Sequence, residues 1–260
     1  MGESVPYAVY LPEAYDEGGE RLPVLYLLHG GGGNELSWVD KGEIKRHADV
    51  AIGEGILSPM IFVMPAANRS RYINNYDRSV RYEDFFMEEF IPHIESVFHV
   101  VRGREGRILM GSSMGGYGSV VLAMKHPSEF LACVSFMGSF CEDDRVLAMS
   151  TAEWNESTRG SVYGRDLGKH DRFTDHYRSN DPCHLIDRAE ASLLRSVAWY
   201  LDCGDDDFRL SGNMRFFQRM RSLSVPIELR VRDGGHGMGY ARGGLRGSFA
   251  FIAKALKAKD

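Results

Sequence analysis

Gly111-Ser112-Ser113-Met114-Gly115 is the stretch that decides the fold, because its G-x-S-x-G spacing is that of a nucleophile elbow. It follows a short apolar run at 107–110 and precedes a run with helical character at 118–126, which is the strand–turn–helix context that an elbow needs. The central serine of an elbow lies on a tight turn with about 1–3 kcal/mol of backbone strain. Small residues two positions on either side leave room for that turn. Ser113 has glycine at both positions and Ser112 has neither, so Ser113 is the predicted nucleophile.

The composition excludes several other classes of protein. The chain has 260 residues, of which 43% are hydrophobic and 26% charged, and its net charge is −5. Interspersed acids and bases argue against a nucleic-acid or anionic-membrane partner, and the apolar runs fall far short of the ~20 residues of a membrane helix. The first six residues have neither a basic segment nor an apolar core. We therefore expect no secretion signal and a cytoplasmic location, although a mature secreted domain would begin in the same way.

The apolar runs alternate with segments of helical periodicity, which predicts a mostly parallel sheet covered by helices on both faces. In 83–97 the apolar residues recur at three- and four-residue spacing, which predicts an amphipathic helix that bends or restarts at Pro92. No repeat or linker-like stretch interrupts the chain, so we expect one α/β domain over residues 1–260. The predicted strands are 22–28, 60–64, 107–110, 131–137, 196–201 and 226–231, and the other predicted helices are 44–56, 118–126, 212–223 and 245–256.

One long segment breaks this alternation between the predicted strands 131–137 and 196–201. Its part at 151–188 is polar, rich in Arg, Asp and His, and shows little periodicity. Insertions of this kind in compact folds often form lids or substrate walls, and the alternative is a solvated surface excursion. We expect a lid or substrate-wall insertion at 141–190.

The four cysteines do not predict a metal site. They form no C-x-x-C pair and no zinc-like spacing, and the chain has no H-E-x-x-H motif, so we expect neither a metal nor a cofactor. Cys133 and Cys203 lie in or beside apolar runs and are predicted to be buried thiols. The sequence leaves open whether Cys141 and Cys183 meet.

Three further features favour a catalytic elbow over an ordinary glycine-rich turn, and the first is a histidine late in the chain. A serine hydroxyl needs a base that is itself oriented by a carboxylate, and in the α/β-hydrolase arrangement the chain order is serine, acid, histidine. His236 follows the last predicted strand in the glycine-rich loop 232–237 and precedes the terminal helix. His236 is therefore the predicted base.

The second feature is an acidic loop after the preceding strand, at 202–208. Asp202 is close to the strand end and is expected to point into the fold, whereas Asp205 and Asp206 have the character of turn residues. Asp207 is far enough along to reach His236, with Phe208 to anchor it, and is the predicted acid.

The third feature is His29-Gly30-Gly31-Gly32-Gly33, directly after the first buried strand. Acyl transfer needs backbone N–H groups aimed at the oxyanion, and glycines let the backbone approach closely. We expect these donors to be the N–H groups of Gly31 and Met114, with His29 bracing the loop. No Lys-Ser/Thr follows and no G-x-G-x-x-G spacing is present, so the run is not a phosphate loop.

Four residues are candidates for the substrate pocket, and ordinary packing or surface exposure is the alternative for each. They are Trp38, just beyond the glycine loop, and Tyr72, Asn74 and Tyr76, which follow the strand that ends at Met64.

The whole chain resembles the esterase D-like α/β hydrolases, the group that includes feruloyl and acetylxylan esterases of carbohydrate esterase family 1. The resemblance is carried by Tyr10-Leu11-Pro12, 28–33, 111–116, 203–208 and Gly234-Gly235-His236. The Cys-Gly-x-x-Asp pattern of that family implies Asp207 as the acid. The family also includes S-formylglutathione hydrolases, short-chain esterases, siderophore esterases and mycolyl transferases, and its members differ in the insertion.

The expected function is a serine carboxylic-ester hydrolase that works through an acyl-enzyme without a cofactor. We expect a small-molecule or oligosaccharide ester as substrate, with a short acyl or hydroxycinnamoyl group on a plant polysaccharide. A general short-chain carboxylesterase, or an S-formylglutathione hydrolase-like enzyme, is the alternative. Two alternatives from other classes are an acyltransferase, which would use the same residues, and a non-catalytic binding protein, which we would expect to lack a triad member. The oligomeric state is left open.

Overall fold

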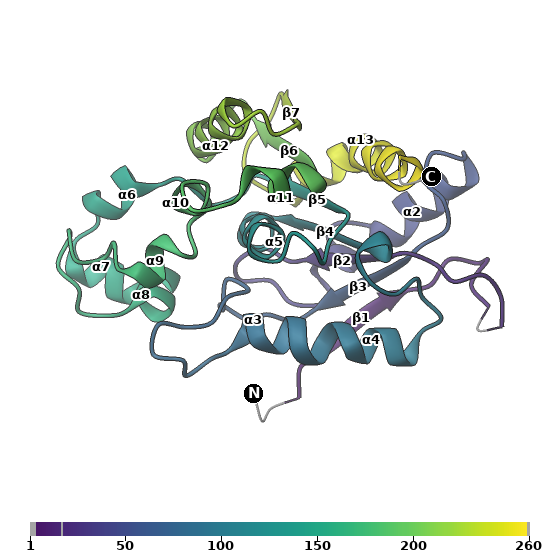
Figure 1. Cartoon of the computed structure of the whole chain (residues 1–260), viewed down its shortest axis with the longest axis horizontal. Coiled ribbons are helices and arrows are strands. Elements are labelled where there is room, and N and C mark those ends of the chain that lie inside the picture. Colours follow the sequence, from purple (N-terminus) through teal and green to yellow (C-terminus); the bar gives the residue numbers. More distant parts are fainter. Residues whose placement is uncertain (1–3, 17, 259–260) are drawn as a thin grey trace.

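The computed structural model describes residues 4–16 and 18–258, whose centre is a seven-stranded sheet in the order β1-β3-β2-β4-β5-β6-β7 (Figure 1). All neighbouring strands are parallel except β1, which pairs antiparallel with β3 and was not predicted. β1 has only four residues, and three of them are half-buried at the edge of the sheet, so its sequence shows no clear strand pattern. The strands are β1 (Tyr7–Tyr10), β2 (Val24–Leu28), β3 (Ile61–Pro65), β4 (Arg107–Ser112), β5 (Ala132–Phe136), β6 (Ala198–Gly204) and β7 (Ile227–Arg232).

Helices cover both faces of the sheet, as the continuous apolar runs predict. The helices outside the insertion are α1 (Ser37–Asp40), α2 (Ile44–Gly53), α3 (Tyr82–Asp84), α4 (Ile91–Val97), α5 (Met114–Lys125), α11 (Ala191–Ser196), α12 (Leu210–Ser222) and α13 (Met238–Lys257). A π-helical turn, Phe85–Phe90, joins α3 to α4, and a 3-10 turn, Arg104–Gly106, precedes β4. Because α11 occupies Ala191–Ser196, the predicted strand at 196 begins two residues later, at Ala198.

The helix expected over 83–97 restarts where the sequence predicts. α4 begins at Ile91, and Pro92 lies in its first turn, where proline is better tolerated than in a helix interior. The wider hydrogen-bonding pattern of the π-helical turn lies directly before it. Figure 1 shows α3 and α4 as one coil along the sheet.

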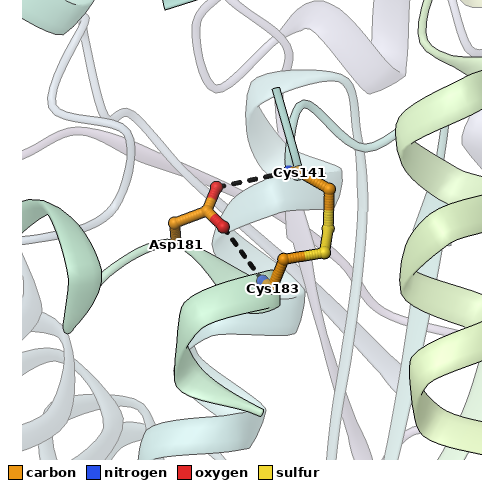
Figure 2. Close-up of side chains that lie close together, drawn as sticks. All are labelled: Cys141, Asp181 and Cys183. Atoms are coloured by element: carbon orange, nitrogen blue, oxygen red, sulfur yellow. Dashed lines mark hydrogen bonds between the residues drawn. A yellow bond between two sulfur atoms is a disulfide. The ribbon is translucent and has the colours of Figure 1, made fainter. Parts of the chain in front are cut away.

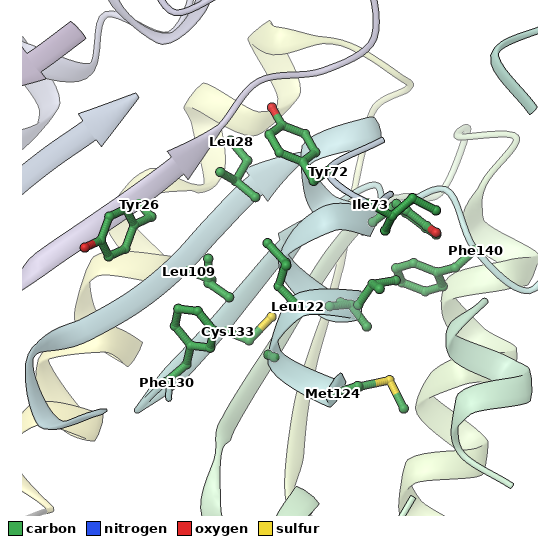
Figure 3. Packing of buried hydrophobic residues seen from close by; sticks show 14 of the residues in the cluster. Tyr26, Leu28, Tyr72, Ile73, Leu109, Leu122, Met124, Phe130, Cys133 and Phe140 are labelled. Carbon is green, nitrogen blue, oxygen red and sulfur yellow. The ribbon is translucent and has the colours of Figure 1, made fainter. Parts of the chain in front are cut away.

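The side chains of each strand divide between two apolar cores. Along β2, Val24, Tyr26 and Leu28 point to the face covered by α5 and the α3–α4 coil, and Figure 3 shows part of that packing around Leu109 and Leu122. Leu25 and Leu27 point to the opposite face, which α2 and α13 cover. Among the helices that the structure describes, none is long and apolar enough to cross a membrane.

The insertion at 141–190 forms packed structure with buried side chains. It holds the short helices α6 (Asp143–Ala148), α7 (Thr151–Glu156), α8 (Thr158–Tyr163), α9 (Asp175–Arg178) and α10 (Pro182–Leu185). Trp154 is fully buried in the first apolar core and donates its indole N–H to the Gly164 carbonyl at 2.7 Å. A disulfide between Cys141 and Cys183 ties the start of the insertion to α10, while Cys133 and Cys203 are buried free thiols, as expected.

The turn between β4 and α5 requires glycine at two positions. A Cβ atom on Gly111 would lie 2.4 Å from the backbone of Gly115, and one on Gly115 would lie 2.2 Å from the Leu28 carbonyl oxygen. The elbow therefore closes directly onto the end of β2, which leaves no space for a methyl group at either place.

Gly115→Ala is expected to lower the free energy of unfolding by about 1–3 kcal/mol or to prevent folding, because the added methyl group would overlap the Leu28 carbonyl. Chemical denaturation followed by circular dichroism measures the effect. Gly53→Ala is the matched control, since a Cβ atom there meets no atom within 4 Å at the end of α2. We expect the control to be neutral or stabilising by up to about 1 kcal/mol. Equal stabilities of the two variants would contradict the tight packing of the turn.

Candidate active site

Ser113 lies at the top of the elbow in a strained backbone conformation, with φ 55° and ψ −109°. It stands between the last residue of β4 and the first residue of α5. Its N–H donates to the Phe136 carbonyl at 2.8 Å, and its carbonyl accepts the Tyr117 N–H at 2.9 Å. These two bonds fix the residue to β5 and α5, so its hydroxyl is held away from the sheet on a rigid support.

A continuous line of hydrogen bonds joins the predicted nucleophile, base and acid. The Ser113 Oγ lies 2.9 Å from His236 Nε2, and His236 Nδ1 lies 2.8 Å from Asp207 Oδ2. Asp207 follows β6 and His236 follows the neighbouring strand β7, so the carboxyl ends of adjacent parallel strands bring them together. A carboxylate only accepts, so Nδ1 carries a proton and Nε2 is left to accept from the serine hydroxyl. The arrangement is that of a Ser-His-Asp triad.

Two of the other three carboxylates of the acidic loop, Asp202 and Asp205, have different environments. Asp202 is completely buried within β6, where it accepts hydrogen bonds from Arg232 and Tyr240. Asp205 accepts the Gly234 N–H at 3.0 Å, which ties the acidic loop to the loop that carries the histidine. The structure thus places Asp202 in the fold, as expected, and gives Asp205 a loop-bridging contact that turn propensity did not predict.

Asp207 itself is fixed from both sides. Its side chain is fully buried, with one carboxylate oxygen facing His236 and the other accepting the Arg209 N–H at 2.8 Å. Phe208, whose ring is 58% exposed, packs against the His236 ring with their centroids 4.8 Å apart. The expected anchor therefore acts on the base rather than on the acid.

The two expected oxyanion donors lie side by side. Within the described part of the chain, neither the Gly31 nor the Met114 N–H has a hydrogen-bond partner. A Cβ atom on Gly31 would be 4.0 Å from the Met114 Cβ. Both groups flank Ser113, which is where acyl transfer places a negatively charged oxygen.

His29 holds the glycine loop in place, as expected. Its Nδ1 donates to the Gly30 carbonyl at 2.8 Å, and its Nε2 accepts the Ala67 N–H at 2.9 Å. Burial lowers the pKa of His29, so the ring is neutral and its tautomer is set by these two contacts. The ring thereby ties the glycine loop to the segment after β3.

A cavity of about 170 Å³ opens over the nucleophile, and five of its twelve lining residues are glycines. The lining side chains that the sequence did not single out are Ser37, Lys41, Met137 and Met238. Met137 follows β5 and Met238 begins α13, so each reaches the cavity only because the sheet order brings its element next to the elbow. The complete lining is residues 30–33, Ser37, Lys41, Ser112, Ser113, Met137, His236, Gly237 and Met238.

The four candidate substrate residues do not line this cavity, and for two of them the prediction is wrong. Trp38 and Tyr72 are fully buried and have no free surface for a ligand. Trp38 donates its indole N–H to the Leu28 carbonyl at 3.0 Å, and Tyr72 donates its hydroxyl to the His29 carbonyl at 2.9 Å. Both side chains support the glycine loop from below. Asn74 exchanges hydrogen bonds with Asp84, and Tyr76 is half exposed beside His176.

Two other features of the described residues lie apart from the chemistry. A cavity of about 640 Å³ lies at the amino ends of β6 and β7, opposite the triad. Three groups of side chains bring possible cation ligands together. In two of them the atoms already form a disulfide or accept hydrogen bonds, and the third is an exposed acidic group of a common kind, so we assign no metal to them.

The chain matches known proteins over most of its length. The family model described as "Putative esterase" matches residues 1–251. An esterase of Mycobacterium tuberculosis is 28% identical over 246 residues, which are 88% of this chain and 51% of that protein, so the chain spans about half the length of this relative. The acetyl esterase of Caldicellulosiruptor saccharolyticus is 23% identical over 92% of this chain and 86% of that protein. A solved structure of a ferulic acid esterase has a TM-score of 0.79 and 31% identity, with 96% of this chain and 92% of that chain covered.

Asp207→Asn is expected to lower kcat for p-nitrophenyl acetate by about four orders of magnitude, because an amide does not hold the histidine tautomer that accepts the serine proton. Asp205→Asn keeps an oxygen for the Gly234 N–H and is expected to leave kcat nearly unchanged, as is Asp206→Asn. Asp202→Asn removes the charge that faces Arg232 and is expected to lower the melting temperature rather than kcat. Steady-state kinetics on folded variants test the assignment. A folded Asp202→Asn variant as inactive as Asp207→Asn would show that the acid is assigned wrongly.

Proposed function

The chain belongs to the "Putative esterase" family, and from this premise we propose that it is a serine esterase whose catalytic triad is Ser113, His236 and Asp207. The observation that carries the proposal is the unbroken line of hydrogen bonds from the serine hydroxyl through the imidazole to the buried carboxylate, at 2.9 and 2.8 Å. Serine, acid and histidine follow one another along the chain in the α/β-hydrolase order.

The first half-reaction forms an acyl-enzyme. The Ser113 Oγ attacks the ester carbonyl carbon while its proton passes to His236 Nε2, and Asp207 stabilises the resulting imidazolium. The carbonyl oxygen becomes an oxyanion that accepts hydrogen bonds from the Gly31 and Met114 N–H groups. When the tetrahedral intermediate collapses, His236 returns the proton to the leaving alcohol and the acyl group stays on the serine.

The second half-reaction releases the acid. A water molecule takes the place of the alcohol and attacks the acyl carbon while His236 removes its proton. The same two N–H groups stabilise the second oxyanion, and collapse returns the proton to the Ser113 Oγ. Every proton transfer in both halves uses His236, so the two halves share one geometry.

For the substrate, we propose esters whose acyl group is short or is a single-ring hydroxycinnamoyl group, carried on a plant polysaccharide or its oligosaccharides. Two observations support this choice. The cavity at Ser113, about 170 Å³, lies below the usual ~300–1,000 Å³ of drug-sized ligand pockets and is close to the ~150 Å³ that accommodates a benzene ring. The 31% identical solved structure is that of a ferulic acid esterase.

The second candidate is a short-chain carboxylesterase without carbohydrate recognition, including the S-formylglutathione hydrolase-like activity. The small volume of the cavity and the five glycines in its wall favour it, since neither offers many groups to recognise a sugar. Transfer of the acyl group to an acceptor other than water would use the same triad, and product analysis with a competing alcohol separates the two reactions.

Hydrolysis of a panel of esters tests the proposed substrate class. The panel is p-nitrophenyl acetate, butyrate and octanoate beside methyl ferulate and acetylated xylo-oligosaccharides, with Ser113→Ala as the blank. We expect serine-dependent hydrolysis of the acetate, the ferulate and the xylan esters, and a value of kcat/KM for the octanoate at least tenfold below that for the acetate, because a flexible eight-carbon chain loses conformational entropy on binding that a short acyl group or a rigid ring does not lose.

Each other result has a definite meaning. Serine-dependent activity confined to the small p-nitrophenyl esters would favour the short-chain esterase. Octanoate hydrolysis as efficient as acetate hydrolysis would contradict the preference for short or rigid acyl groups. Full activity of Ser113→Ala would contradict the triad.

A further inference from the structure

Three buried arginine side chains gather between the insertion and the acidic loop, and two of them share a single carboxylate. Arg159, in α8, and Arg209, directly before α12, both donate to Glu142, whose side chain is 10% exposed. The third, Arg71, donates to the Ser139 carbonyl at 3.0 Å and has no carboxylate partner among the described residues. A buried cation is stable only where hydrogen bonds or an opposite charge compensate it. Glu142 is therefore the charge on which this cluster depends.

Burial makes the cluster sensitive to the loss of that carboxylate. Burial, and secondarily the charge of Arg71, lower the pKa values of Arg159 and Arg209 to about 10. Both guanidinium groups therefore still carry their charge at neutral pH, and neither can become neutral to relieve a missing partner. Without Glu142 in place, the side chain of Arg209 has to move toward water.

Arg209 is also in contact with the catalytic acid and, through its neighbour, with the base. Its backbone N–H donates to Asp207 Oδ1 at 2.8 Å. Its guanidinium lies 4.7 Å from the centre of the Phe208 ring, and that ring packs against His236. Arg209 therefore joins Glu142, which its side chain contacts, to the Asp207 carboxylate, which its backbone N–H contacts.

The Cys141–Cys183 disulfide stands directly before Glu142 and fixes its backbone. Cys141 has φ 58°, a left-handed conformation that residues other than glycine rarely adopt. The carboxylate of Asp181 accepts the N–H groups of both cysteines, at 3.2 and 2.9 Å, so that the two half-cystines and Asp181 form one buried unit (Figure 2). The Cys141 carbonyl accepts from Arg215 in α12, the helix that follows the acidic loop.

We propose that Glu142 is a positioning residue for the catalytic acid, and that the Cys141–Cys183 disulfide keeps it in place, so that the esterase is active in the oxidised form and impaired when this bond is reduced. The inference rests on the proposed triad, because it acts through Asp207. Reduction by a dithiol breaks the S–S bond. The dithiol gives up two electrons and two protons, the two cysteines become thiols, and the dithiol becomes a cyclic disulfide.

The test measures turnover and also the rate at which Ser113 reacts with a covalent probe. Wild type is assayed before and after treatment with dithiothreitol, with the number of free thiols counted by alkylation and mass spectrometry. The variants Cys141→Ala/Cys183→Ala and Glu142→Gln are assayed beside it. For each form we determine kcat and KM for p-nitrophenyl acetate, and the rate at which a fluorophosphonate labels Ser113, which requires the triad but not the natural ester.

We expect kcat and the labelling rate to fall roughly ten- to hundredfold in the reduced protein and in both variants, with KM within about twofold, because a small misplacement of a catalytic group costs this much. Reoxidation should restore wild type, and dithiothreitol should not affect the double variant. Glu95→Gln is the matched control. This change breaks the ion pair of Glu95 with Arg107, which lies away from the triad. Both side chains are 12% exposed, so the site is about as shielded from water as Glu142. Glu95→Gln should lower the melting temperature and leave kcat unchanged.

The proposal is overturned if the double variant and the reduced protein keep kcat and the labelling rate within about twofold of the oxidised wild type, or if Glu142→Gln behaves like Glu95→Gln. It is also overturned if activity is lost only together with cooperative unfolding. Failure of the proposed function looks different. In that case oxidised wild type itself fails to hydrolyse the ester and to label at Ser113.

Discussion

The left-handed turn at Ser113 exists because two glycines let β4, α5 and the end of β2 come within contact distance of one another. The same contact sets the neighbours of the nucleophile. It places the Met114 N–H at the start of α5 beside the glycine loop that leaves β2, so the two expected oxyanion donors converge without a dedicated element. Three side chains then hold that loop in place by donating hydrogen bonds to carbonyl groups in it or next to it. His29 donates to the Gly30 carbonyl, Trp38 to that of Leu28 and Tyr72 to that of His29.

The order of the strands in the sheet brings the acid and the base to the nucleophile. β4, β5, β6 and β7 are successive parallel neighbours, so the loops at their carboxyl ends open on the same edge. The acid, Asp207, follows β6, and the base, His236, follows β7. Asp205 joins these two loops by accepting the Gly234 N–H. The insertion between β5 and β6 packs onto the same edge through Glu142 and Arg209, which links it to the loop that carries the acid.

Sequence predicts those parts of the site that rest on local pattern. The elbow, the histidine loop, the acid at Asp207 and the glycine loop each have a signature in adjacent residues, and the alternating apolar runs predict the parallel sheet. Contacts between distant residues leave no such signature. The aromatic rings of Trp38 and Tyr72 are as compatible with a ligand as with a core until their burial is known, and the short edge strand β1 shows no clear alternation. The pairing of Cys141 with Cys183 and of Glu142 with Arg209 likewise depends on how the insertion folds.

The covalent intermediate on Ser113 is the most direct evidence for the proposed chemistry. Mixing the enzyme with p-nitrophenyl acetate, quenching in acid within the first turnover and sequencing the peptide 108–125 by mass spectrometry locates the acetyl group. The predicted result is an early burst of p-nitrophenol with the acetyl group on Ser113, and no burst from Ser113→Ala. Turnover with the acetyl group on Ser112 or elsewhere, or turnover with no covalent adduct at all, would contradict the assignment of the nucleophile.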